Sequence, residues 1–176
     1  IPDNVPSEMA PLAEPLTIAL HALHRAQLKA GEHVVIIGAG AIGLMAALSS
    51  LNYKATPILV DIVDERLQYA KSLGVPYVVN SAKANVIEAV KDITQGTMAQ
   101  VVVEASGANS AIRSTLDLAS FAGRIAYTGW PKQETSLPTN LITFKELDLR
   151  GSRTSAGEFE EALQMLSTLN INPADI

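Results

Sequence analysis

The residues with the clearest chemical meaning are three glycines that follow an apolar run. Val34–Ile37 leads directly into Gly38, Gly40 and Gly43. A strand that turns through such glycines into a helix exposes backbone N–H groups, and the helix dipole adds to their attraction for an anion. The first glycine permits the tight turn, the second lets the backbone approach a pyrophosphate, and the third lets the helix pack on the strand. The sequence therefore predicts a dinucleotide site at this turn.

An acidic residue stands where such a site needs one. Asp61 closes the next apolar segment, about 20 residues beyond the glycines. A carboxylate there accepts hydrogen bonds from the adenosine ribose and opposes the extra phosphate of NADP, so we expect NAD. A second and compatible interpretation makes Asp61 the N-cap of a helix that begins near Asp64. Arg66 either borders the adenosine, which would leave some tolerance of NADP, or is a solvated helix charge.

Small and polar residues also follow later apolar runs. Ser106 and Gly107 come after one run, and Thr128–Trp130 after another. Ser106 is either a residue of the ligand cleft or part of a plain turn. Trp130, the only tryptophan, is either a ligand contact or an aromatic that covers the core at its rim. Because turns need such residues as well, this grouping alone does not identify a site.

Other kinds of chemistry find little support. The chain has no cysteine, which rules out disulfides and thiolate metal sites within it and suits the cytoplasm. His21 and His24 share a helical face with no carboxylate at a suitable spacing, so we interpret them as structural residues and not as metal ligands. The net charge of -5 argues against nucleic acid as a partner, and the apolar runs are too short for a membrane span.

Familiar catalytic motifs are missing too. The sequence contains neither a Gly-x-Ser-x-Gly turn nor a Walker-type loop, and no Tyr-x-x-x-Lys pair. The residues themselves therefore predict a cofactor site without the groups that would carry out a reaction.

The periodicity of the chain predicts the scaffold for these residues. Apolar, strand-sized runs alternate with helical patterns from Gly31 onward. The expected strands are 33–37, 57–60, 77–79, 100–104, 124–128 and 147–151, and the expected helices are 41–51, 64–73, 85–94, 109–121 and 157–169. Returns of this length suit parallel βαβ units covered on both faces. We predict an α/β fold with a doubly wound, six-stranded parallel sheet that binds its ligand at the carboxyl ends of the strands.

A different kind of segment comes first. Residues 1–30 are punctuated by prolines and carry a leucine pattern of helical spacing that ends at Gly31. We therefore predict two parts, a lead-in of residues 1–30 that joins a further domain and a dinucleotide-binding domain of residues 31–176. The first residues contain no initiator Met and no basic or apolar signal, so we expect a piece of a longer protein.

Together these motifs resemble one family. The chain looks like the cofactor-binding domain, a Rossmann fold, of zinc-containing medium-chain dehydrogenases, and it is most similar to their sorbitol, polyol and sugar-acid branch. The similarity extends over nearly the whole chain. It rests on Ala13–Leu16, the helix through His21, Gly31–Leu44, Asp61 with Arg66 and Leu67, and Ala105–Gly107.

The resemblance implies an enzyme that oxidises a secondary alcohol of a polyol, sugar or sugar acid. In this family zinc polarises the hydroxyl group, and hydride passes to the nicotinamide ring of NAD. Glu14 matches a glutamate that faces the zinc, although by itself it is an acid suited to a first helical turn. Arg153 matches an arginine that contacts substrate hydroxyls, but Thr154 replaces the usual aromatic neighbour. The implied cofactor contacts are Ile42, Asp61, Arg66, Thr128, Gly129, Trp130, Ser152 and Arg153.

The resemblance also implies parts that lie outside the chain. The zinc ligands belong to a catalytic domain, with Glu14 as the only candidate among these residues, so we expect the chain alone to bind cofactor and to catalyse little. Family members commonly pair through the edge of this sheet, which implies a homo-oligomer.

Two other functions stay open at this stage. A regulatory module that senses dinucleotides would use the same fold without hydride transfer, but it would have no need of Glu14 and Arg153 at the nicotinamide end. A methyltransferase would also use a glycine loop and a ribose-binding acid, but Gly43 fits the dinucleotide turn better.

Overall fold

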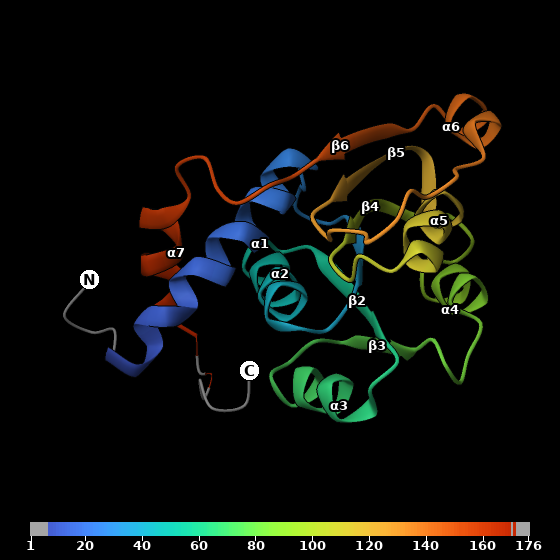
Figure 1. Ribbon diagram of the computed structural model, residues 1–176. Coiled ribbons are helices and arrows are strands. Elements are labelled where there is room, and N and C mark those ends of the chain that lie inside the picture. Colours follow the sequence, from blue (N-terminus) through green and yellow to red (C-terminus); the bar gives the residue numbers. More distant parts are fainter. Residues whose placement is uncertain (1–6, 170, 172–176) are drawn as a thin grey trace.

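Strands and helices alternate along the chain in a computed structural model, which describes residues 7–169 and 171 (Figure 1). Six strands form one sheet in the order β3-β2-β1-β4-β5-β6, and all neighbouring strands are parallel. This confirms the doubly wound parallel sheet that the sequence predicts. The strands are β1 (His33–Ile37), β2 (Thr56–Asp61), β3 (Tyr77–Asn80), β4 (Ala99–Glu104), β5 (Ala119–Tyr127) and β6 (Asp148–Gly151).

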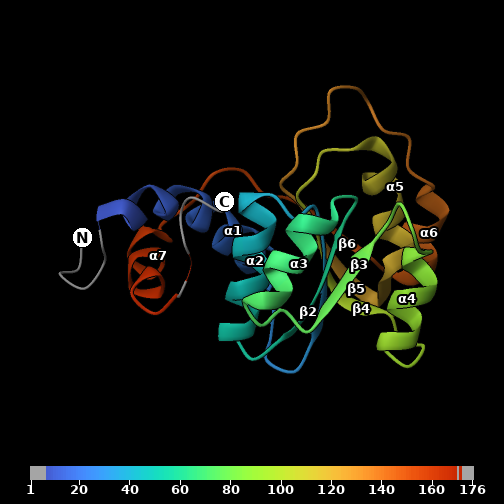
Figure 2. The same cartoon turned by 90° about the horizontal axis from the view of Figure 1, so that it is seen from below.

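Helices cover both faces of the sheet. Figure 2 shows α1, α2, α3 and α7 on one side and α4, α5 and α6 on the other. The helices are the 3-10 helix η1 (Ser7–Leu12) and α1 (Ala13–Arg25), α2 (Ala41–Asn52), α3 (Asp64–Ser72), α4 (Val86–Ile93), α5 (Asn109–Leu118), α6 (Thr139–Lys145) and α7 (Phe159–Leu166). No helix in the described part of the chain is long and apolar enough to cross a membrane.

The alternation of side chains along β1 separates two apolar cores. Val34 and Ile36 belong to the core beneath α1 and α2, whereas Val35 and Ile37 belong to the core beneath α4 and α5. All four are buried, as expected for a central parallel strand covered on both faces. Because the strands are fixed from both sides, the turns at their carboxyl ends have defined positions.

The described part of the lead-in packs into this same structure. Leu16, Leu20 and Leu23 of α1 are fully buried in the core that α2 shares. The predicted boundary between residues 30 and 31 stays a prediction, and residues 1–6 of the lead-in lie outside the described residues.

The largest differences from the predicted boundaries lie at α5, β5 and α7. The helix expected over 109–121 ends at Leu118, because Lys145 donates hydrogen bonds to the carbonyls of Leu116, Asp117 and Ala119 at the helix end. Strand β5 therefore begins earlier than expected, with a break in its register to β4. Helix α6, which supplies Lys145, was not predicted. The last helix spans Phe159–Leu166 and not 157–169. It begins later than predicted, since Gly157 has a positive φ of 112°.

The strand order indicates which edge of the sheet binds a ligand. β1 pairs with β2 on one side and with β4 on the other, so the chain reverses direction between these neighbours. Ligands of such sheets bind beyond the carboxyl ends of the strands at this point. The glycine turn follows β1 there, and Asp61 ends β2.

Candidate functional site

The three glycines of the turn after β1 have three different surroundings. Gly38 has a φ of 104°, and a Cβ on it would lie 3.1 Å from the Ser106 nitrogen. A Cβ on Gly43 would lie 1.7 Å from the carbonyl oxygen of Gly38, so this position requires glycine. Gly40 has no atom within 4 Å of such a Cβ. Two glycines thus close the turn against the protein, and the third leaves open space in front of the first N–H groups of α2.

Asp61 is oriented by backbone amides at the end of β2. One carboxylate oxygen, Oδ2, accepts a hydrogen bond from the N–H of Ala39 at 2.6 Å. The other accepts from Ile62 at 2.7 Å and from Val63 at 2.9 Å. The N-cap interpretation of Asp61 is therefore wrong: the N-cap position of α3 belongs to Val63, and Asp61 binds the amides that precede the helix. With 9% of its surface exposed, Asp61 is a preoriented carboxylate beside the glycine turn.

A first pocket, which we call the glycine-turn pocket, lies between this turn and α3. It has a volume of about 460 Å³ and is lined by Ala39, Gly40, Ala41, Leu44, Glu65, Arg66 and Tyr69. The Arg66 side chain is 56% exposed, and its Nη1 lies 4.0 Å from Asp61 Oδ2. The pocket therefore combines open helix amides with a cation at its rim, close to the buried carboxylate.

A neighbouring hollow was missed in the sequence. It lies where β1 and β2 end beneath α4 and α5, and it is lined by Ile37, Val60, Ile62, Ser81, Val86, Ser110, Ala111, Ser114 and Leu118. Ile62 could have indicated it, because this large apolar residue follows the buried acid directly. In the structure Ile62 is 68% exposed.

A second pocket, the β5–β6 pocket, gathers segments that are far apart in the chain. Its volume is about 410 Å³, and it lies beyond the carboxyl ends of β5 and β6. The lining residues are Ile18, Ile42, Tyr127, Thr128, Gly129, Trp130, Gly151, Ser152, Arg153 and Thr154. Six residues expected near a cofactor thus meet at one place: Ile42, Thr128, Gly129, Trp130, Ser152 and Arg153.

Two polar features mark the β5–β6 pocket as a place for a ligand. The hydroxyl of Ser152 is buried and has no hydrogen-bond partner among the residues that the structure describes. Buried polar groups are usually paired, so this hydroxyl is available to a bound molecule. The guanidinium of Arg153 lies 5.7 Å from the centre of the Trp130 ring, within the range of a cation–π contact.

A buried carboxylate joins the turns after β4 and β5. Glu104 is fully buried, and its side chain accepts hydrogen bonds from the N–H groups of Ser106 at 2.9 Å and Gly107 at 3.0 Å. A Cβ on Gly129 would lie 2.4 Å from Glu104 Oε2, so the next turn packs directly on this carboxylate. Burial raises the pKa of Tyr127, its hydrogen bond with Thr115 partly opposes this, and the charge of Glu104 adds to the increase.

Sequence reasoning passed over Glu104 as the end of an apolar run. An acidic residue that closes such a run directly before a Ser-Gly turn was the available signal. The structure places Ser106 in the turn held by Glu104 and outside the linings of the glycine-turn pocket and the β5–β6 pocket.

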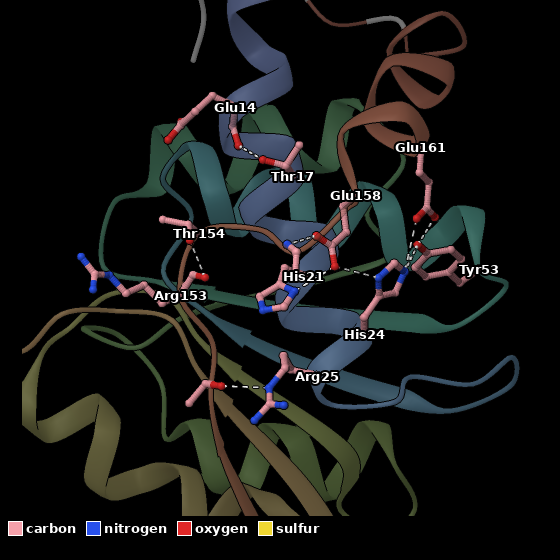
Figure 3. A network of polar contacts seen from close by, with 12 residues as sticks. Glu14, Thr17, His21, His24, Arg25, Tyr53, Arg153, Thr154, Glu158 and Glu161 are labelled. Atoms are coloured by element: carbon pink, nitrogen blue, oxygen red, sulfur yellow. Dashed lines mark hydrogen bonds and ion pairs between the residues drawn. The ribbon is translucent and has the colours of Figure 1, made fainter.

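Glu14 lies on α1, one turn before Ile18, with its side chain exposed and outside the lining of the β5–β6 pocket. Figure 3 shows the side chains of Glu14 and Arg153 extending to the same side of α1. Within residues 7–169 and 171, no group of three or more His, Asp or Glu residues is arranged to hold a metal ion. The described residues therefore do not form a zinc site by themselves.

Taken together, the carboxyl edge offers a continuous set of sites for an extended ligand. Helix amides suit a phosphate group, the nearby carboxylate suits a sugar diol, and the β5–β6 pocket supplies an unpaired hydroxyl beside an aromatic ring. This arrangement is suited to holding and orienting a molecule.

Comparisons with known proteins agree in kind. The sequence model of a family described as zinc-binding dehydrogenase matches residues 41–168. An uncharacterised zinc-type alcohol dehydrogenase-like protein of Haemophilus influenzae is 68% identical over the whole chain, which covers 52% of that relative. A sorbitol dehydrogenase of Bacillus subtilis is 31% identical over 96% of the chain and 48% of its own length.

One similar solved structure contains a bound cofactor. A protein of Escherichia coli described as a short chain alcohol dehydrogenase, in complex with NADH, superimposes with a TM-score of 0.88 at 29% identity. The match covers all of this chain and 52% of that one. The chain thus spans about half the length of each of these relatives.

Proposed function

Because this chain belongs to the zinc-binding dehydrogenase family, we propose that it binds NAD(H) as the cofactor-binding part of an enzyme that oxidises a secondary alcohol. The observation that carries the proposal is the alignment of the glycine-turn pocket, Asp61 and the β5–β6 pocket along one edge of the sheet. Along this edge Asp61 after β2 comes first, the glycine turn after β1 second and the β5–β6 pocket last. An extended dinucleotide has an adenosine ribose, a pyrophosphate and a nicotinamide ring in that same order.

Each group of this chain then has a role in holding the cofactor. The N–H groups at the start of α2 bind the pyrophosphate, and Asp61 accepts hydrogen bonds from the adenosine ribose. Ser152, Arg153 and Trp130 surround the nicotinamide end. Bound NAD supplies the hydride acceptor, and the protein contributes its orientation and the exclusion of water.

NAD is favoured over NADP by the carboxylate at the end of β2. The Asp61 side chain is buried and oriented by three amides, so a phosphate on the ribose would meet a fixed negative charge. Arg66, 4.0 Å from the carboxylate, leaves a limited tolerance of NADPH.

The substrate that we propose is a polyol, sugar or sugar acid. Support comes from the sorbitol dehydrogenase among the relatives and from Arg153 at the rim of the β5–β6 pocket. A catalytic zinc would need ligands beyond the described residues, with Glu14 as a candidate to face it. Pairing of two copies through the exposed edge at β6, the last strand of the sheet, belongs to the same proposal.

Nucleotide titrations of the chain test this function. NADH and NADPH are added separately while the emission of Trp130 is followed, in the parent chain and in Asp61→Asn. We expect saturable NADH binding that is tighter than NADPH binding. Loss of the charge should weaken NADH binding by about tenfold, equivalent to about 1.4 kcal/mol, and narrow the difference between the nucleotides.

Asp64→Asn is the matched control. Asp64 is three residues away and exposed, and it contacts Lys83 and Asn80, not the glycine turn. This variant should bind NADH as the parent chain does. A chain that is folded by circular dichroism but binds neither nucleotide would overturn the proposal.

A further inference from the structure

A third buried carboxylate, after Asp61 and Glu104, belongs to Glu158. Glu158 precedes α7 and is 7% exposed. Its Oε1 lies 2.8 Å from Nδ1 of His21 and 3.3 Å from Nδ1 of His24, both on α1 (Figure 3). Its Oε2 accepts a hydrogen bond from the N–H of Ala156 at 2.5 Å. One carboxylate therefore joins helix α1 to the segment that leads into α7.

That segment, residues 152–158, carries Ser152 and Arg153 into the β5–β6 pocket. Its first residue is held to the sheet, because the N–H of Ser152 donates to the Tyr127 carbonyl at 2.8 Å. Its last residue is Glu158. Between Ser152 and Glu158 the backbone has a positive φ at two residues, 54° at Thr154 and 112° at Gly157. This conformation is unfavourable for threonine but not for glycine. A segment with this conformation needs a fixed attachment at each end.

Helix α1 forms the opposite wall of the same pocket. Ile18 lines it, and His21 stands one turn further along the helix. The contact between His21 and Glu158 therefore links the wall that carries Ile18 to the far end of the segment that carries Arg153. At the near end, Arg25 of α1 donates a hydrogen bond to the Gly151 carbonyl at 3.0 Å.

The ionised state of Glu158 suits this role. Burial raises its pKa, but the hydrogen bonds from Ala156 and His21, with smaller contributions from its own N–H and His24, outweigh the burial and lower the pKa to about 2. Glu158 is thus an anion at neutral pH. A second acid, Glu161 of α7, contacts His24 and the hydroxyl of Tyr53 on the outer side of the same network.

From this geometry we propose that Glu158, through His21 and Ala156, is a positioning residue that holds Arg153 against Trp130 at the nicotinamide end of the cofactor site. The inference rests on the proposed function for the identity of the ligand. The positioning itself concerns only the chain.

The competing explanation is that Glu158 merely attaches α7 to the protein. Helix α7 has other attachments, however. Ala162, Met165 and Leu166 are buried in the core, and the hydroxyl of Ser49 contacts the Met165 sulfur at 3.2 Å. The replacement Glu158→Gln should therefore leave α7 in place while weakening the hold on residues 152–158.

Quenching of Trp130 by iodide distinguishes the two explanations without any nucleotide. Trp130 is the only tryptophan and is 78% exposed, and the Arg153 guanidinium beside it attracts an anionic quencher. Acrylamide, which is neutral, reports exposure alone. We expect Glu158→Gln to lower the ratio of iodide to acrylamide quenching toward the value of Arg153→Ala, and to weaken NADH binding by about threefold to tenfold.

Glu160→Gln serves as the matched control. Glu160 is an exposed acid in the first turn of α7, so the charge change is the same, and quenching and binding should stay at the parent values. His21→Gln, which removes the imidazole and keeps the carboxylate, should reproduce the effect of Glu158→Gln and replaces that variant if it does not fold.

The outcomes separate the possible failures. A folded Glu158→Gln chain with the parent quenching ratio overturns the positioning role, even if its melting temperature falls. A chain that shows the expected change in quenching but binds no NADH contradicts the proposed function and leaves the positioning of Arg153 supported.

Discussion

The glycine-turn pocket and the β5–β6 pocket are built in different ways. The first is lined by the glycine turn, the start of α2 and three residues of α3. Beside it, Asp61 contacts three amides that follow the adjacent ends of β1 and β2. The second is assembled from α1, α2 and the segments after β5 and β6. Its buried hydroxyl at Ser152 has no partner in the described chain, and its aromatic residue, Trp130, is exposed.

The difference has a functional meaning. A site that binds a pyrophosphate meets the same chemical groups in every dinucleotide, and local backbone geometry is enough to hold them. The β5–β6 pocket would receive the reactive ring and lie nearest to the substrate, so it depends on side chains that loops can exchange. We expect the glycine-turn pocket to be disrupted by added side-chain volume. We expect the β5–β6 pocket to be disrupted when its side chains are no longer held in place.

The largest expected effect on stability is at the glycine turn. Gly43→Ala would place a methyl carbon 1.7 Å from the Gly38 carbonyl oxygen, so the start of α2 must shift. We expect a loss of more than about 3 kcal/mol in the free energy of unfolding, measured by urea denaturation. Gly40→Ala is the comparison, since its methyl group enters open space. This variant should fold with nearly parent stability and bind NADH more weakly. Equal losses of stability in both variants would contradict the distinction between the two glycines.

A medium effect is expected where the turns after β4 and β5 meet at Glu104. Glu104→Gln places an amide NH₂ or a single carbonyl oxygen opposite the N–H groups of Ser106 and Gly107. The unfolding free energy should fall by about 2 kcal/mol, because a buried donor is left without a full partner. Glu134→Gln, at an exposed position, should change it by less than about 0.5 kcal/mol. Parent stability in Glu104→Gln would show that the turns are held by the backbone alone.

The smallest expected effect has opposite signs for stability and binding. Ser152→Ala removes a buried hydroxyl that has no partner in the described residues, so thermal unfolding should show no loss, or a gain of up to about 1 kcal/mol. NADH binding should weaken, because in the proposed complex the Ser152 hydroxyl forms a hydrogen bond with the nucleotide. If the variant is less stable and binds NADH normally, Ser152 belongs to the scaffold and the comparison between the pockets loses its sharpest point.

The glycine-turn pocket could be predicted from the sequence because the residues that indicate it are close together in the chain. Glycine spacing after an apolar run fixed the turn, and the end of the next run fixed the place of Asp61. Even here the partners of Asp61 were only partly predictable, since the contact with Ala39 joins two strands across the turn.

The second pocket could not be predicted in the same way. The contacts of Glu158 with His21 and His24 connect residues at opposite ends of the chain, and no sequence pattern predicts such contacts. The end of α5 likewise depends on Lys145, which belongs to a helix that the periodicity did not reveal. Family resemblance, not residue pattern, pointed to Ile42.

The place of β1 between β2 and β4 has a consequence for synthesis. A nascent chain that has not yet reached Ala99 can pair β1 with β2, but the other edge of β1 stays open, because its partner β4 has not been made. This open edge is the apolar run that ends in the glycine turn. During translation the same segment that later defines the binding site is the one most exposed to wrong pairing, until the second half of the sheet arrives.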